Sequence, residues 1–207
     1  MVKPDLLKSV LESVVAVRDR DHRVIGTGVA VATDTVLTAL HVTTGQGPGS
    51  LVVGDGRPVL GVASLPTWRF GWSLRQARLC RRRSTALTGV DNATVDLALL
   101  DVPGLAVPQA QLSYTAVRTG ELIAIAGYPN GRWTATVGPV TSTDDADYVA
   151  RVLLGPGSSG APAFDQVGRV CGLVTMDHLT AGSILIGPRL LSAFVEHARP
   201  CSWCRQR

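Results

Sequence analysis

The chain has 207 residues, 45% of them hydrophobic and 17% charged, which fits one large domain or two packed halves and excludes a disordered protein. The net charge is +4, with 20 Lys and Arg against 16 Asp and Glu, and so small an excess does not argue for a nucleic-acid partner. We find neither a secretory signal nor a membrane span, so no membrane partner is expected. The four cysteines are too few for a dense disulfide framework, which favours a reducing, cytoplasmic setting.

The first predicted element is a short helix at residues 5–12, where apolar residues recur at helical spacing. After it, ten short segments are rich in Val, Ile and Thr and are separated by Gly, Pro, Asn or Asp, which is typical of β-strands. They cover residues 13–21, 24–33, 35–42, 50–55, 95–102, 121–129, 133–142, 147–154, 162–177 and 183–191. Residues 189–199 return to helical spacing and predict a closing helix. Many short strands with no helical pattern between them predict an all-β barrel or sandwich.

Three fragments carry residue types that could perform chemistry together. His41 ends the apolar strand VLTALHV, Asp96 heads the aliphatic run DLALL, and Ser159 lies within GPGSSGAP. Each fragment alone has an ordinary structural explanation, since a histidine can simply pack at a strand end and Gly/Ser turns are common. An aspartate at the head of a buried strand, however, needs a partner.

The chemistry of a serine nucleophile requires all three residues. A serine hydroxyl attacks poorly unless an imidazole removes its proton, and the imidazole needs a carboxylate on its other nitrogen. The developing oxyanion needs fixed donors, and a glycine-rich turn can aim the backbone amides of Gly157 and Ser159 at one oxygen. The order along the chain is His41, Asp96, Ser159.

Four fragments together resemble the trypsin-like (chymotrypsin-fold) serine peptidases, in the style of the bacterial HtrA and glutamyl-endopeptidase branches. GTGVAVATDTVLTALHV (26–42) is similar to the family's G-S-G strand followed by T-A-x-H. DLALL (96–100) is similar to the segment around the catalytic aspartate, and AIAGYPNG (124–131) to a G-[YN]-P-G turn. GPGSSGAPAFDQVGRVCGLVT (155–175) is similar to G-N-S-G-G-P followed by a strand, a turn and V-x-G-[IL]-V. The register of this last motif selects Ser159 as the nucleophile and gives Ser158 the variable position.

The resemblance implies a single peptidase domain over residues 1–207 with two six-stranded antiparallel β-barrels. The N-terminal barrel is expected at about 13–105, the C-terminal barrel at about 115–188 and the closing helix at about 189–199. The implied function is that of a serine endopeptidase acting on a protein or peptide substrate without a cofactor or metal. His41 would act as base and then acid, Asp96 would orient it, Ser159 would form an acyl-enzyme, and the amides of Gly157 and Ser159 would form the oxyanion hole.

Several positions depart from the family pattern or concern the substrate pocket. Ala161 replaces the second glycine of the G-x-S-G-G pattern. Leu153 stands where enzymes that cut after Lys or Arg carry an acid, so an uncharged, small or apolar side chain is the expected substrate preference. Asp177 lies near the expected pocket wall and leaves a polar preference open. Thr175 falls where the family often has a hydroxyl that helps to hold the catalytic aspartate, also near the pocket.

Other readings of the sequence stay open. A catalytically silent protein of the same fold could act as a protein-interaction module. The chain could also be the peptidase part of a longer bacterial signalling or defence protein, switched on by an activating protein partner. The basic run 80–83 reads first as a solvated loop, with a partner surface as its alternative. His197, Cys201 and Cys204 have spacings that zinc could use, but three ligands without a fourth make a weak zinc site.

Overall fold

The computed structural model describes residues 10–44, 46, 50–54, 57–59, 61–64, 96–144, 146–178 and 181–198. Of the predicted N-terminal helix 5–12, residues 10–12 are described; residues 10 and 11 are helical and Glu12 lies in a turn. The basic run 80–83, Cys201 and Cys204 lie outside the described residues, as does the side chain of His197.

The N-terminal half is a seven-stranded antiparallel sheet with the strand order β5-β4-β1-β2-β3-β7-β6. The sequence predicted five of these strands, together with a six-stranded barrel, but not β5 or β6. Two of the strands on the β5 side span only two residues each, and β5 contains Pro58, so neither hydrophobic alternation nor length marks β5 in the sequence. The strands are β1 (Val14–Arg18), β2 (Val24–Ala32), β3 (Thr35–Ala39), β4 (Val52–Val53), β5 (Arg57–Pro58), β6 (Gly61–Ser64) and β7 (Leu97–Asp101).

The C-terminal half is a closed barrel of six strands, in the order β10-β13-β12-β11-β8-β9, and every pairing that forms it is antiparallel. The predicted six-stranded barrel is confirmed here. Its strands are β8 (Leu122–Gly127), β9 (Thr134–Thr143), β10 (Asp147–Ala150), β11 (Pro162–Phe164), β12 (Val170–His178) and β13 (Gly182–Ile186), and a 3₁₀ turn, η2 (Pro129–Gly131), joins β8 to β9.

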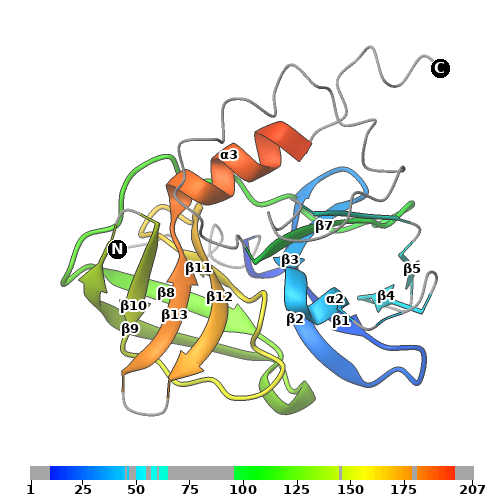
Figure 1. Ribbon diagram of the computed structural model, residues 1–207, viewed down its shortest axis with the longest axis horizontal. Coiled ribbons are helices and arrows are strands. Elements are labelled where there is room, and N and C mark those ends of the chain that lie inside the picture. Colours follow the sequence, from blue (N-terminus) through cyan, green and yellow to red (C-terminus); the bar gives the residue numbers. More distant parts are fainter. Residues whose placement is uncertain are drawn as a thin grey trace.

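One hydrophobic core joins the two halves and the closing helix α3 (Pro188–Ala198). The amphipathic α3 contacts β12 of the barrel and β7 of the sheet, and it runs across both halves (Figure 1). Leu191 and Phe194 of α3 are buried in the same cluster as Leu37 of the sheet and Phe164 of the barrel. Because burial of such side chains contributes about 2 kcal/mol each, this shared core fixes the two halves relative to each other. No helix among the described residues is long and apolar enough to span a membrane.

Candidate active site

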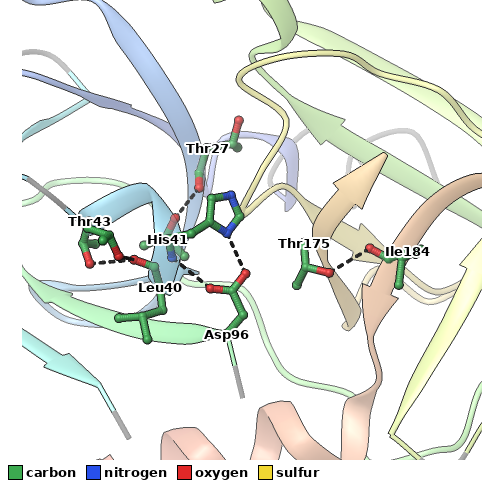
Figure 2. Close-up of polar contacts among 9 residues, drawn as sticks. Thr27, Leu40, His41, Thr43, Asp96, Thr175 and Ile184 are labelled. Carbon is green, nitrogen blue, oxygen red and sulfur yellow. Dashed lines mark hydrogen bonds and ion pairs between the residues drawn. The ribbon is translucent and has the colours of Figure 1, made fainter. Parts of the chain in front are cut away.

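His41 and Asp96 form a hydrogen-bonded pair at one end of the sheet. β3 ends at Ala39, and the short helix α2 (Leu40–Thr43) carries His41 directly after it. The imidazole Nδ1 lies 2.6 Å from Asp96 Oδ2, and the backbone amide of His41 donates to Asp96 Oδ1 at 2.8 Å (Figure 2). The Asp96 carboxylate therefore fixes both the backbone and the ring of His41. The sequence predicted that Asp96, at the head of a buried strand, needs a polar partner, and His41 is that partner.

The geometry of this pair sets the tautomer of the imidazole. The Asp96 carboxylate can only accept a hydrogen bond, so Nδ1 of His41 carries the proton that it donates to Asp96, and Nε2 is left as the basic nitrogen. The hydrogen bond to Asp96 raises the pKa of His41 above its usual 6.5, partial burial opposes this increase, and the charge of Asp96 adds to it. The His41 side chain is 48% exposed, which leaves the ring accessible to a substrate.

Ser158 and Ser159 are neighbours in the glycine-rich turn but differ in their surroundings. Ser158 is only 3% exposed, and its hydroxyl donates to the carbonyl of Gly155 at 2.7 Å. Ser159 is half-buried, and within the described part of the chain its hydroxyl makes no hydrogen bond. Ser158 therefore has a structural partner, whereas the hydroxyl of Ser159 is available for other contacts.

Backbone contacts place Ser159 beside the end of β3 that leads to His41. The carbonyl of Ser159 accepts from the amide of Thr27 on β2 at 2.8 Å. A Cβ on Gly160 would lie 2.1 Å from the Thr27 carbonyl oxygen and 3.0 Å from the Ala39 amide, and Gly160 has φ +82°, so only glycine fits there. The turn thus contacts Ala39, two residues before His41, so the backbone of the serine turn docks on the strand that leads to His41.

The side chain of Thr27 binds the same turn from the other half of the molecule. Its hydroxyl donates to the carbonyl of Gly157 at 2.8 Å and accepts from the amide of Tyr128 at 3.0 Å. Thr27 is completely buried, so these bonds lie away from water. In the sequence, Thr27 stands out only as the middle residue of the G-T-G motif, and that motif is the signal for a functional side chain at this position.

The peptide between Pro156 and Gly157 is held in one orientation by η2. The carbonyl of Pro156 accepts from the amide of Asn130 in η2 at 2.6 Å. In a trans peptide the N–H points opposite to the C=O, so the Gly157 amide points away from η2. Neither the Gly157 nor the Ser159 amide donates to another atom of the described residues. Both amides can therefore donate to a bound ligand.

The alanine that replaces the second glycine of the family pattern fits without a clash. Ala161 is fully buried, and a Cβ on Gly127 of β8 would lie 2.9 Å from its methyl carbon. Because Gly127 has no side chain, the methyl group of Ala161 occupies that space. The departure at Ala161 is thus accommodated by packing.

Of the three predicted pocket residues, Leu153 lines a cavity of the described part of the chain that the other two do not line. Leu153, which is 58% exposed, lines a cavity of about 490 Å³ together with Leu154, η2 and the beginning of β9, and neither Thr175 nor Asp177 takes part. The hydroxyl of Thr175 donates to the carbonyl of Ile184 at 3.3 Å (Figure 2). The hydrogen bonds among described residues include none from Thr175 to Asp96. Asp177 binds the glycine-rich turn, as described below.

The described residues contain no group of three or more His, Cys, Asp and Glu side chains that could hold a metal ion. Cys171 on β12 is a buried free thiol that contacts the hydroxyl of Tyr148 at 3.7 Å. Burial raises the pKa of this thiol to about 12, so it stays protonated and unreactive.

Solved structures with the same fold include serine proteases and an inactivated protease paralogue. The active form of the Rv3671c protease from M. tuberculosis has a TM-score of 0.69 and 22% identity, covering 98% of this chain and 91% of that one. The HtrA-type protease AlgW with a decapeptide has a TM-score of 0.66 and 17% identity, covering 93% and 67%. A scabies mite inactivated protease paralogue has a TM-score of 0.66 and 16% identity, covering 89% and 92%. At these identities the likeness shows the fold alone.

The family follows from the sequence comparison. No curated protein sequence matches the chain significantly. A family model for the trypsin-like peptidase domain matches residues 26–173, which includes His41, Asp96 and Ser159. The chain therefore belongs to the trypsin-like peptidase family and is a serine endopeptidase.

Proposed function

We propose that the protein hydrolyses peptide bonds through an acyl-enzyme on Ser159, with His41 as general base and acid and Asp96 as its orienting carboxylate. The observation that carries the proposal is the 2.6 Å bond between His41 Nδ1 and Asp96 Oδ2, next to the β3 end where the backbone of Ser159 docks. The bond leaves Nε2 as the base, and the docking of the Ser159 backbone beside β3 supports Ser159 as the residue that Nε2 activates.

In the first half-reaction, Ser159 Oγ attacks the carbonyl carbon of the substrate while His41 Nε2 takes the hydroxyl proton. The carbonyl oxygen becomes an oxyanion that accepts hydrogen bonds from the amides of Gly157 and Ser159. Breaking the C–N bond then releases the amine, which receives the proton from Nε2. The product is an ester between the acyl group and Ser159.

In the second half-reaction, water replaces Ser159 as the nucleophile. Nε2 removes a proton from the water as its oxygen attacks the ester, and the same proton returns to Ser159 Oγ when the C–O bond breaks. The carboxylic acid product leaves and the enzyme is restored. Asp96 stabilises the imidazolium in both steps by accepting from Nδ1–H.

Labelling with a fluorophosphonate probe tests the proposal directly, because such probes react with activated serines. We expect the native chain to be labelled and Ser159→Ala to lose all labelling. Ser158→Ala is the matched control, because it removes the neighbouring hydroxyl and should leave a labelled, slower protein. Undiminished labelling of Ser159→Ala would show that another residue is the nucleophile.

A folded native chain that takes no label would favour the silent interaction module instead. We propose further that a protein partner activates the enzyme, and the same labelling experiment tests this when the partner is added. If a partner orders the site, its addition raises the labelling rate of the native chain and leaves Ser159→Ala unlabelled. The cytoplasmic setting stays a prediction from the cysteine content.

A further inference from the structure

The carboxylate of Asp177 lies between two strands of the barrel and the glycine-rich turn. Asp177 is half-buried near the end of β12 and pairs in register with Ser183 of β13. Its Oδ2 accepts from the amide of Gly155 at 2.6 Å and from the amide of Leu154 at 3.3 Å. Its Oδ1 lies 2.5 Å from the hydroxyl of Ser183.

The same carboxylate also reaches the far end of the turn. The hydroxyl of Ser158 lies 3.3 Å from Asp177 Oδ2, and both the hydroxyl and the amide of Ser158 donate to the carbonyl of Gly155, at 2.7 and 3.2 Å. Asp177 therefore contacts both ends of the four-residue turn 155–158, and these ends are also bonded to each other. Gly157, whose amide we place in the oxyanion hole, lies between them.

The segment before the turn is held through Ser183. Its hydroxyl lies 2.6 Å from the carbonyl of Val152, so Ser183 bridges this carbonyl and Asp177. Asp177 and Ser183 together connect β12 and β13 to residues 152–158. Glycines have the largest conformational freedom, and both Gly155 (φ +88°) and Gly157 (φ +92°) lie in the left-handed region. A turn of this composition needs side-chain bonds to keep one conformation.

These contacts argue against a direct role of Asp177 in binding a substrate side chain. A carboxylate has about four acceptor positions, and two backbone amides and two hydroxyls of the protein surround this one. A basic substrate side chain would have to displace them.

We propose that Asp177 is a positioning residue, whose carboxylate holds the turn 155–158 so that the Gly157 amide faces the substrate carbonyl. This inference rests on the proposed function, since it concerns the oxyanion hole of that reaction. The role is geometric, because each group that Asp177 contacts is an uncharged amide or hydroxyl.

Two variants and one control separate this role from general stability. Asp177→Ala removes every bond between this carboxylate and the turn. In Asp177→Asn the amide oxygen can accept from Gly155 while the amide nitrogen donates to Ser183, whose own proton then serves Val152. Asp165→Ala is the matched control, because Asp165 also accepts two backbone amides in this barrel, those of Val167 and Arg169, in the turn between β11 and β12.

The first measurement is the rate of fluorophosphonate labelling. Removal of one oxyanion donor costs about 10² to 10³ in rate, so loss of the support behind it should slow Asp177→Ala by about tenfold or more. We expect Asp177→Asn to stay within about threefold of the native rate, because it keeps the acceptor for Gly155. Asp165→Ala should be labelled at the native rate. Native-like labelling of Asp177→Ala overturns the proposal.

The second measurement is amide hydrogen exchange, which needs no activity. In Asp177→Ala the amide of Gly155 should exchange about tenfold faster, while the amide of Gly160, which donates to the Val174 carbonyl, should keep its rate. If the native chain takes no label, the proposed function fails, and amide hydrogen exchange at Gly155 alone tests whether Asp177 holds the turn. Unchanged exchange at Gly155 overturns the inference in either case. If Asp177→Ala does not fold, Asp177→Ser, which is too short to reach Gly155, takes its place with the same expected and overturning results.

Discussion

Asp96 and Asp177 are both half-buried carboxylates near the proposed site, but they bind different kinds of groups. Asp96 accepts from the ring and the backbone amide of His41. Its main partner is therefore the imidazole whose Nε2 takes up and releases the proton of the reaction. Asp177 accepts from two backbone amides and contacts two hydroxyls, none of which titrates near neutral pH. The same side chain can therefore serve proton transfer in one place and loop geometry in another.

The two aspartates also belong to different halves of the molecule. Asp96 precedes β7 of the sheet, and Asp177 lies on β12 of the barrel. Each half thus contributes one carboxylate. The hydroxyl of Thr27 joins the two halves, because it donates from the sheet to Gly157 of the turn that Asp177 contacts. Changing each group in turn should reveal a proton-transfer defect, a docking defect or a geometric defect.

The largest effect is expected for Asp96→Asn. An amide cannot hold the Nδ1–H tautomer or stabilise the imidazolium as a carboxylate does, so kcat/KM for a peptide substrate should fall by about 10⁴-fold. The matched control is Asp101→Asn at the other end of β7, where the side chain is exposed and activity should be unchanged. A loss smaller than about tenfold, with the fold intact by circular dichroism, would contradict the role of Asp96.

A smaller effect is expected for Thr27→Val, which keeps the shape of the side chain and removes its hydroxyl. The Gly157 carbonyl and the Tyr128 amide then lose a buried partner, which should lower the free energy of unfolding by about 1–3 kcal/mol. Labelling of Ser159 should slow by about tenfold, because the bond that docks its turn on the sheet is lost.

Thr141→Val is the control for this change. The hydroxyl of Thr141 also donates to a backbone carbonyl, that of Val149, but within the barrel. Denaturant unfolding and the labelling rate are measured on both variants. If both slow labelling equally, the contact between the halves has no special role.

The sequence predicted the residues of the site better than the contacts that hold them. His41, Asp96 and Ser159 stand in local motifs of fixed composition, and the structure brings the elements that carry them together. The bonds of Thr27 to Gly157 and Tyr128 join residues about a hundred or more positions apart. Local patterns of polarity do not report such contacts, so the sequence could not reveal what the Thr27 hydroxyl binds.

The strands of the fold also differ in how well the sequence predicts them. The strands of the closed barrel are long or strongly apolar and were predicted, whereas β5 has two residues, one of them Pro58, and was missed. Such a strand forms because its neighbour β4 offers hydrogen-bonding groups, and its own residues have little β-propensity. For Asp177 the sequence placed the residue near a pocket wall. Its contacts with the turn became visible only when β12, β13 and residues 152–158 were seen together.

The smallest difference, and the sharpest comparison of the two aspartates, is in the pH dependence. Only neutral His41 can accept the proton of Ser159, so kcat/KM should rise with pH through the pKa of His41 and level off above it. Because the hydrogen bond to Asp96 raises this pKa above 6.5, the rise should be centred above that pH in the native chain.

In Asp96→Asn the residual activity should rise at a lower pH. In Asp177→Asn the profile should keep the native position, since the groups that contact Asp177 do not titrate in this range and none of them is His41. Profiles of kcat/KM from pH 5 to 9 for the three proteins test this, and a shift in Asp177→Asn equal to that in Asp96→Asn would mean that both carboxylates act through the charge of His41.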